Sequence, residues 1–480
     1  MSVGFFYRTG MAGAGELLWP QRMGYAPDCN TSVGVSYKKR TDRASHKMKQ
    51  ISYEECLERM YKRGRFGIKL GLETISEILT NLGSPEKRFK SIHIAGTNGK
   101  GSIASYIASI LKEAGFKVGL YTSPHLIKFN ERFVINGREV SDNDIVEAYV
   151  ALNKADTAER KATFFELATA IAFYLFAREG VEWAIIETGM GGRLDATNIL
   201  LPKLSVISNI SLEHTEYLGN TLEAIAMEKG GIIKHKTPVV TGVNQENALA
   251  VLTKLAQKNM APLYRLDNDF HVSQEPDRTR FTYNGIERTI TGVQTRLPGL
   301  HQLDNSAIAI AAVELVFPPQ KKQASVLSDE IIQRGISKTQ WPGRLETIMQ
   351  TPFVVIDGAH NLAAAINLAR YFEEKFSDKR LTLVLGILDD KDFSSMLKQF
   401  VPWADRIIFT RADNKRSIDP HLLEQTARTL FTGEITVIEK VGDAVAHAIA
   451  TSSSQDAVCI AGSLYVAGEA RKKILTDIRP

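Results

Sequence analysis

Residues 91–102 read Ser91-Ile-His-Ile-Ala-Gly-Thr-Asn-Gly-Lys-Gly-Ser102, and this stretch decides the fold. Its apolar start predicts a buried strand, and the glycine-rich part leads into an apolar-faced helix from Ser102. A strand, a glycine loop and a helix start in that order form an anion site, because backbone N–H groups and the helix N-terminus converge on phosphate. Lys100 can reach the outer phosphates, so the sequence predicts a phosphate-binding loop.

The loop departs from the standard phosphate-loop pattern G-x-x-x-x-G-K-[ST]. The first glycine of that pattern would fall on Ile94, and Gly101 separates Lys100 from Ser102. The structural alternative is a glycine-rich turn that merely starts a helix.

Apolar runs alternate with helical patterns on both sides of this loop, which indicates βαβ units and parallel sheets. Before residue 340, further strands are predicted at Val118–Tyr121, Trp183–Glu187, Leu204–Ile210 and Pro238–Gly242, with helices through 222–227 and from Asn247. After Trp341-Pro342, strands are predicted at Phe353–Asp357, Leu381–Leu385, Ile407–Thr410, Ile435–Ile438 and Ala457–Ala461, with a helix through 362–372.

The predicted fold class is therefore α/β. We expect a P-loop-type, mainly parallel sheet domain at 48–340, followed by a smaller Rossmann-like α/β domain at 341–480. The alternating stretch Phe270–Thr291 turns at Asn284-Gly285 and predicts a hairpin in or beside the first domain.

The net charge of +5 on 480 residues is concentrated at the N-terminus. Residues 1–47 hold seven basic and three acidic residues, which leaves +1 for the rest. They show no periodicity, so we expect a disordered leader or a misassigned start before Met48, and a transit peptide remains an alternative. The balance favours neither nucleic acid nor a membrane as partner.

Three cysteines are too few for a disulfide framework or a zinc site. The longest apolar stretch, 164–177, contains Glu166 and falls short of the ~20 residues that a membrane span needs, so we expect a buried helix. The sequence thus predicts a cytoplasmic protein, and we expect a monomer.

Several separated motifs carry a resemblance to a known family. They are 66–73 (FGIKLGLE), the loop 96–102 (GTNGKGS), 121–126 (YTSPHL), 129–132 (FNER), 187–198 (ETGMGGRLDATN), 228–232 (EKGGI), 341–344 (WPGR), 357–361 (DGAHN) and 462–465 (GSLY). In this order they resemble the Mur-ligase superfamily, and within it the folylpolyglutamate synthase and bifunctional dihydrofolate synthase family.

The resemblance implies an ATP- and Mg²⁺-dependent ligase that activates a carboxylate as an acyl phosphate and joins it to L-glutamate. The implied small-molecule acceptors are 7,8-dihydropteroate and reduced folates. Three alternatives stay open: folylpolyglutamate synthesis alone, another Mur-type ligase acting on peptidoglycan precursors, and a nucleotide-binding regulator without catalysis.

Two polar side chains follow predicted strands, where a metal ligand is expected. Glu187 ends an apolar strand and His214 lies just past another, although a lone histidine is often structural. The resemblance implies that Ser123, Glu187 and His214 bind one Mg²⁺, with Ser102 near the phosphate-bound metal. It also implies that Lys229 is carbamylated and serves a second Mg²⁺, although a lysine beside Glu228 and glycines reads at first as a solvated helix end.

The nucleotide contacts are expected from both domains. The loop supplies Thr97, Asn98, Gly99, Lys100, Gly101 and Ser102. By resemblance, Asn305 contacts the nucleotide, Arg344 reaches the phosphates, Asp357 contacts the ribose or positions His360, and His360 joins the catalytic groups. The alternative for 357–361 is a helix cap and turn, which Asp and Asn favour.

The pterin needs aromatic faces and a few hydrogen-bonding groups. Family segments that line the dihydropteroate pocket match Phe164, Phe165, Leu194, Asp195 and Ala196, and residues 68–71 are a further candidate by the same resemblance. On periodicity alone, the better interpretation is that the two phenylalanines are core residues of the buried helix.

Overall fold

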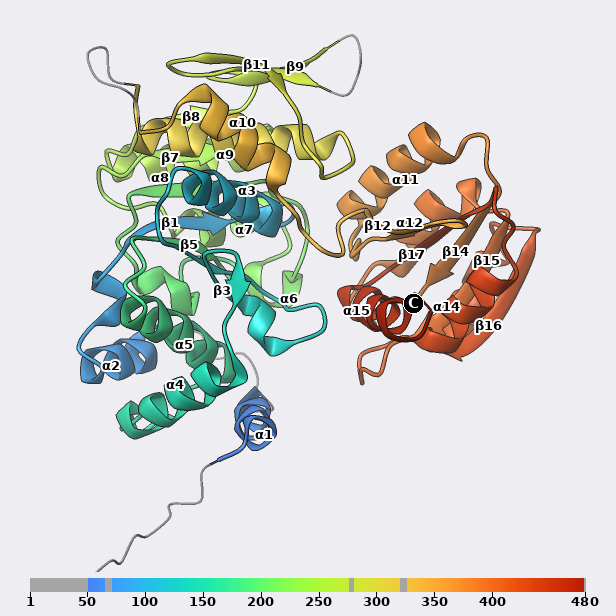
Figure 1. Cartoon of the computed structure of the whole chain (residues 1–480), viewed down its shortest axis with the longest axis horizontal. Helices are drawn as coiled ribbons and strands as arrows, with labels where there is room; N and C mark the ends of the chain where they lie inside the picture. The colour runs from blue at the N-terminus through green and yellow to red at the C-terminus, as the bar shows by residue number, and fades with distance from the viewer. Residues whose placement is uncertain (1–50, 65–70, 276–279, 320–325, 479–480) are drawn as a thin grey trace, which may run out of the picture. The chain divides into compact units, whose positions relative to one another are not determined.

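The computed structural model describes residues 51–64, 71–275, 280–319 and 326–478 (Figure 1). The predictions made for residues 1–47, and most of those for 66–73, lie outside the described residues. Three sheets are present in this part of the chain, and helices accompany the two larger ones.

The first sheet is mainly parallel, as predicted. Its strands are β1 (Lys90–Ala95), β2 (Val118–Tyr121), β3 (Phe133–Ile135), β4 (Arg138–Glu139), β5 (Trp183–Glu187), β6 (Leu204–Ile207), β7 (Val239–Thr241) and β8 (Leu263–Arg265). They lie in the order β4-β3-β2-β5-β1-β6-β7-β8, and only β3 and β4 run antiparallel to their neighbours in this described sheet. The central position of β1 places the glycine loop in the middle of the sheet's carboxyl edge.

Alternation along the strands assigns the two faces of this sheet. Ile92 and Ile94 pack with α3 (Lys100–Glu113), α9 (His301–Val316) and α10 (Asp329–Lys338). The opposite face, which carries Ala184 and Ile186, packs against a second set of helices: α1 (Tyr53–Gly64), α2 (Glu73–Asn81), α4 (Asp142–Ala155) and α5 (Phe164–Arg178). The predicted buried helix at 164–177 is α5.

The predicted hairpin is part of a three-stranded antiparallel sheet. Strands β10 (Phe281–Asn284) and β11 (Thr289–Val293) flank the expected turn, and β9 (His271–Gln274) pairs with β10 as a third strand. A buried carboxylate ties this sheet to α9, because Glu314 accepts hydrogen bonds from the Tyr283 hydroxyl (2.7 Å) and from the N–H of Glu287 (2.8 Å).

The third sheet lies entirely after Trp341. Its strands are β12 (Glu346–Gln350), β13 (Phe353–Ile356), β14 (Leu381–Leu385), β15 (Arg406–Arg411), β16 (Glu434–Lys440) and β17 (Ala457–Ala461). The order is β12-β13-β17-β14-β15-β16, parallel apart from β12 in the described part of the chain. One face packs with α11 (Leu362–Phe376), α12 (Phe393–Phe400) and α13 (Pro420–Ala427), and the other with α14 (Val441–Ala450) and α15 (Leu464–Lys473). The boundary at residue 341 stays a prediction.

Strand β6 is three residues shorter than predicted, because the chain turns away to support the phosphate loop. After Ile207, the Ser208 hydroxyl donates to the Asn98 carbonyl (2.6 Å), and Asn209 Oδ1 accepts from the Asn98 N–H (2.9 Å). The hydrogen bonds of Ser208 and Asn209 to the phosphate loop therefore end the strand before Ile210. The chain then forms α6 (Thr215–Leu218), α7 (Leu222–Gly230) and α8 (Glu246–Lys258).

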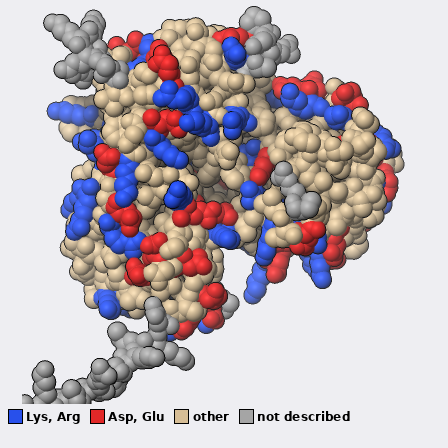
Figure 2. All heavy atoms as spheres, in the orientation of Figure 1, with Lys and Arg blue, Asp and Glu red and all other residues tan. Residues whose placement is uncertain are grey.

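Two of the cysteines, Cys56 and Cys459, are buried and free. Among the described residues, no helix has the length and apolar character that a bilayer span would require. On the face drawn in Figure 2, basic and acidic side chains are interspersed. This mixture fits the near-neutral charge of residues 48–480.

Candidate active site

The predicted phosphate loop follows β1 and ends in a helix start. Gly99 precedes α3 with φ 82°, a left-handed conformation that favours glycine, and a Cβ there would lie 2.5 Å from Asn305 Oδ1. Lys100 is the first residue of α3, and its Nζ donates to the Gly96 and Thr97 carbonyls (both 3.1 Å). The lysine is therefore held over the loop rather than extended into solvent.

A buried carboxylate lies next to Lys100. Glu187 ends β5, is 4% exposed, and places Oε1 3.8 Å from Lys100 Nζ while Oε2 accepts from the Ser123 N–H (3.2 Å). Burial raises the pKa of Glu187, although Lys100 and the Ser123 N–H oppose this. Ser102 is also buried, and its Oγ accepts from Gln302 Nε2 (3.3 Å).

His214 and Lys229 lie at the same edge of the sheet. His214 precedes α6 with φ 52°, and burial is the main cause that lowers its pKa to about 4. The imidazole is thus neutral at pH 7, which is the form that ligates metals. Lys229 Nζ donates to the Gly96 carbonyl (2.7 Å), and burial, followed by the charge of Lys100, lowers its pKa to about 7.

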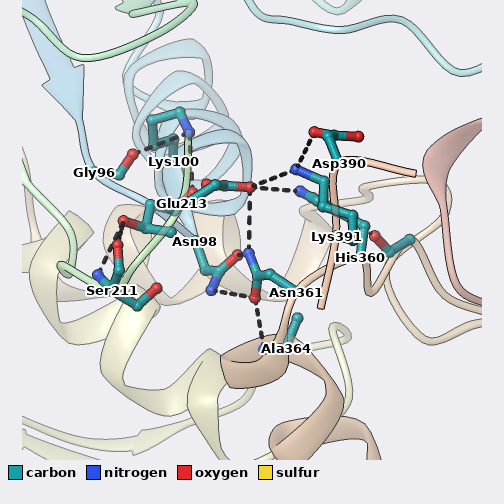
Figure 3. Close-up of polar contacts among 12 residues, drawn as sticks. Gly96, Asn98, Lys100, Ser211, Glu213, His360, Asn361, Ala364, Asp390 and Lys391 are labelled. Atoms are coloured by element: carbon teal, nitrogen blue, oxygen red, sulfur yellow. Dashed lines mark hydrogen bonds and ion pairs between the residues drawn. The ribbon is translucent and has the colours of Figure 1, made fainter. Parts of the chain in front are cut away.

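Residues that follow strands of the third sheet lie next to residues of the first sheet in Figure 3. Glu213 Oε1 accepts from His360 Nε2 (3.1 Å) and Asn361 Nδ2 (3.4 Å), and lies 3.7 Å from Lys391 Nζ. Burial alone would raise the pKa of Glu213, but the His360 hydrogen bond and nearby cations hold it well below its usual range. Asn361 Nδ2 also donates to Asn98 Oδ1 (3.0 Å), so this network reaches the phosphate loop.

Asp357 forms a cap rather than a bond to His360. Its oxygens accept from the N–H groups of Leu345 and Ala359 (2.9 and 2.8 Å), while His360 Nδ1 donates to the Gly358 carbonyl (2.7 Å). No hydrogen bond joins the Asp357 carboxylate to the imidazole among the described residues, and its expected role, to contact the ribose or to position His360, stays a prediction. The carboxylate fixes the turn in which His360 lies.

The loop after β2 fits closely against α15. The carbonyl oxygen of Leu126, which follows Ser123 and His125, lies where a Cβ on Gly468 would be, so only glycine fits at this point of α15 without a shift. The Leu126 side chain also approaches Gly343, next to Arg344. This loop therefore connects the predicted metal ligand Ser123 with the elements around the third sheet.

Most of the predicted nucleotide and metal residues line one cavity of about 220 Å³. Those that line it are Thr97, Asn98, Gly99, Lys100, Gly101, Ser102, Ser123, Glu187, His214, Asn305, Arg344, Asp357 and His360. Lys229 lies beneath the loop and is 3% exposed. The carboxyl edges of both parallel sheets thus contribute to one chemical site.

The five predicted dihydropteroate residues do not line this cavity. Phe164 stacks on Tyr61 (ring centroids 5.0 Å apart), and the Phe165 ring covers Gly189. Asp195 caps its own turn by accepting from the N–H groups of Gly189, Met190 and Thr197, while Leu194 is half-buried and Ala196 buried. Both interpretations of the phenylalanines remain, because the rings pack on the core and border the loop after Glu187.

The cavity includes charged and polar side chains that the sequence analysis did not select. Gln302, Glu213, Lys391 and Arg416 all line it. Lys391 follows the strand β14 within the run Asp389-Asp390-Lys391, so its position after a buried strand is a usable signal. Gln302 lies on a helix, and nothing in its local sequence marks it.

The residues present fit a nucleotide phosphate and a divalent cation. Gly101 has no room for a Cβ because the Trp341 ring lies 2.6 Å from that point, so the loop presents its backbone. The start of α3 adds positive potential and Lys100 a full charge. Ser102, Ser123 and Glu187 supply the oxygen ligands that Mg²⁺ prefers, and His214 adds a neutral imidazole.

Comparison with known proteins agrees with this geometry. The Mur ligase middle domain matches residues 94–313, and the Mur ligase glutamate ligase domain matches residues 343–464. The dihydrofolate synthase/folylpolyglutamate synthase of Bacillus subtilis is 36% identical over 438 residues, covering 88% of this chain and 99% of that protein.

Solved structures resemble the chain over a similar extent. Escherichia coli FolC in complex with DHPP and ADP superposes with a TM-score of 0.80 at 28% identity, covering 87% of this chain and 97% of that one. The bifunctional Yersinia pestis enzyme with AMPPNP and a Mn ion gives 0.79 at 29% identity, covering 88% and 98%. The extent of these matches and the order of the motifs show that the chain belongs to the folylpolyglutamate synthase/dihydrofolate synthase family of Mur ligases.

Proposed function

We propose that the chain adds L-glutamate to 7,8-dihydropteroate and to reduced folates in an ATP- and Mg²⁺-dependent, ADP-forming amide ligation. The observation that carries this is the single cavity into which both sheets direct charged groups: Lys100 and Glu187 from the first, Arg344 and His360 from the second. The match also covers 99% of the Bacillus subtilis dihydrofolate synthase/folylpolyglutamate synthase, whose name gives both activities.

The side chains suit phosphoryl transfer to a carboxylate. Lys100 and Arg344 offset the negative charge that develops on the transferred phosphoryl oxygens, and their fixed positions lower the cost of reorganisation. By resemblance, Ser123, Glu187 and His214 would hold one Mg²⁺, with Ser102 near the phosphate-bound metal and carbamylated Lys229 serving a second ion, and these ions would supply further positive charge there. The buried position of Glu187 keeps this electrostatic stabilisation strong.

Residues of the third sheet are suited to the second step, in which the amine of glutamate attacks the acyl phosphate. An acyl phosphate hydrolyses in water, so the groups around it must exclude solvent until glutamate attacks. The contacts from Glu213 and Asn98 to His360 and Asn361 bring the two sheet edges together at that point. Arg344 and His360 are therefore placed to contact the nucleotide in the cavity that they share with the phosphate loop.

One assay tests the proposal against its alternatives. The purified chain is incubated with ATP, Mg²⁺ and L-glutamate, and dihydropteroate, tetrahydrofolate or a UDP-linked muramyl precursor is added in turn. We expect ADP release and a product heavier by one glutamyl unit with the first two. Turnover with tetrahydrofolate alone would reduce the function to folylpolyglutamate synthesis, turnover with the muramyl precursor alone would contradict the folate assignment, and no turnover would favour a regulator.

We propose in addition a monomer acting in the cytoplasm. The free thiols Cys56 and Cys459 support a reducing compartment. Light scattering coupled to size-exclusion chromatography should give a mass near 53.2 kDa. A mass of twice that value would contradict the monomer.

A further inference from the structure

Arg132 is a buried cation without an anionic partner among the described residues. It ends the short helix η2 (Phe129–Arg132) and is 7% exposed. A second arginine with a largely buried side chain does have anionic partners, since Arg288 Nε lies 3.8 Å from Glu314 Oε1 and Nη1 lies 3.1 Å from Asp329 Oδ1. Burying a charge is costly unless an opposite charge or hydrogen bonds offset it, so the absence of a carboxylate beside Arg132 requires an explanation.

The contacts that hold Arg132 leave most of its donors free. Nε donates to His125 Nδ1 (2.9 Å), and the guanidinium lies 5.8 Å from the Phe129 ring centroid and 5.5 Å from that of Phe164. No described residue accepts a hydrogen bond from either Nη. A guanidinium carries five N–H donors in a planar fork, and the Nη side of the fork is the side that pairs with a carboxylate.

His125 cannot act as a counter-charge for Arg132. Because Nδ1 of His125 accepts the hydrogen bond from Arg132 Nε, that nitrogen carries no proton and the ring is neutral. Burial lowers the pKa of Arg132, yet a guanidinium remains protonated in proteins. The positive charge is therefore permanent, and no described residue supplies its counter-charge.

The location of Arg132 indicates which partner that is. Its hydrogen-bond acceptor His125 lies two residues after Ser123, whose N–H donates to Glu187 Oε2. Glu187 belongs to the phosphoryl site, whereas Phe164 belongs to the proposed dihydropteroate pocket. Arg132 thus lies between the place where the acceptor's carboxylate reacts and the place where its ring system would lie.

We propose that Arg132 binds a non-reacting carboxylate of a glutamyl substrate, through the bidentate pairing that a guanidinium and a carboxylate form. The carboxylate comes either from the terminal glutamate of a folyl acceptor or from the incoming L-glutamate. The inference rests on the proposed function, since only that function brings such substrates to the site. Dihydropteroate has a single carboxylate, which is the reacting one, so it separates the two sources.

The experiment compares Arg132→Gln and Arg132→Lys with the wild-type chain for both acceptors. With tetrahydrofolate, we expect kcat/KM to fall roughly 10- to 100-fold in the Gln variant, the size expected for loss of a charge-assisted pair. The Lys variant should recover part of this loss, and the KM for ATP should stay within about twofold.

The second acceptor identifies the source of the carboxylate. If the folyl acceptor supplies it, Arg132→Gln retains wild-type kinetics with dihydropteroate. If the incoming glutamate supplies it, the KM for glutamate rises with both acceptors. In that case the wild-type preference for glutamate over its α-amide disappears in the variant, a change that a purely structural role for Arg132 would not produce.

Arg288→Gln is the matched control, because it removes a buried guanidinium outside the proposed site. The inference is overturned if Arg132→Gln keeps all substrate constants within twofold of wild type. It is equally overturned if the KM for ATP rises as much as the others and Arg288→Gln does the same. Calorimetry measures the binding of tetrahydrofolate and dihydropteroate to wild type and variant without turnover, and gives the same comparison. If the wild-type protein is inactive, the proposed function fails, but the binding constants still test the role of Arg132.

Discussion

Lys100 lies where a phosphate-binding lysine must be, with Nζ held by two loop carbonyls and Glu187 3.8 Å away. We predict that Lys100→Ala lowers kcat/KM by roughly a thousandfold or more, because it removes a fixed charge facing the transition state. Steady-state ADP release measures the loss, and circular dichroism should show an intact fold. Activity within tenfold of wild type would contradict the phosphate-loop assignment.

His93 is a polar residue in the centre of the first sheet. Thr197 Oγ1 donates to Asp195 Oδ1 (2.5 Å) and therefore accepts from His93 Nε2 (2.7 Å), while His93 Nδ1 has no partner among the described residues. A neutral histidine thus orients the hydroxyl that holds Asp195. The sheet core and the proposed pterin loop are connected through this chain of hydrogen bonds.

The burial of His93 predicts a pH dependence of stability. Burial, followed by the charge of Lys234, lowers its pKa from 6.5 to about 3, so the folded state excludes a proton that the unfolded chain takes up below pH 6.5. Its contribution to the free energy of unfolding is complete above pH 6.5 and is lost as the pH falls towards 3. At pH 5 the loss is about 2 kcal/mol.

Urea unfolding at pH 7.5 and pH 5.0 checks this, with His93→Gln as the comparison. Glutamine can still donate to Thr197 but does not titrate. The decrease in unfolding free energy between the two pH values should therefore be smaller by about 2 kcal/mol in the variant. An equal decrease in both proteins would show that His93 is not the responsible group.

Among the elements, buried apolar strands were the most predictable from sequence. Strands β2, β5, β14 and β17 have the predicted bounds, because each is a mostly apolar run that is buried along its whole length. The helix α4 was not predicted, although Ser141 and Asp144 form a capping box at its start. The edge strand β12 was also missed, since it is only partly buried.

The candidate site was predictable where its residues follow strands. Glu187 ends β5, Asp357 directly follows β13, and Lys100 lies at the end of the glycine loop after β1, so local sequence indicates them. The pairing of Glu213 with His360 joins residues 147 positions apart, and Gln302 reaches Ser102 across 200 positions. Such contacts depend on the packing of distant elements, which periodicity does not reveal.

The sheet formed by β9, β10 and β11 depends on the buried Glu314. We predict that Tyr283→Phe destabilises the protein by about 1–3 kcal/mol, because it removes a hydrogen bond to a buried carboxylate. Thermal unfolding should show a lower Tm, with the KM values unchanged. Tyr174→Phe in α5 is the control, as no described residue hydrogen-bonds to that hydroxyl, and an equal loss of Tm in both variants would contradict the assignment.

At the scale of the whole molecule, two parallel sheets with separate hydrophobic cores share one site. Each sheet can place its own loop residues, but neither alone places Lys100, Arg344 and His360 together. Glu213 is the residue that touches the most groups across this junction in Figure 3, where His360, Asn361 and Lys391 point towards it. Chemistry in this enzyme therefore depends on the distance between two sheet edges that belong to separate hydrophobic cores.

The close fit of Leu126 against Gly468 gives a way to change that distance. We predict that Gly468→Ala lowers kcat at least tenfold while ATP binding stays within about threefold, because displacement of the loop by roughly an ångström misplaces reacting groups without removing a phosphate ligand. Turnover assays and calorimetric ATP binding measure the two effects. Gly442→Ala in α14 is the control, since a Cβ there meets only the flexible Lys473 side chain at 3.5 Å, and equal kinetics in the two variants would contradict the prediction.

The absence of a methyl group at position 468 therefore sets how closely α15 can approach the loop after β2. A family member with a larger residue at this point of α15 must carry a compensating change in the loop after β2, so the two positions are expected to vary together. Exchanging α15 between relatives without that loop would then give chimeras that fold and bind nucleotide but turn over slowly.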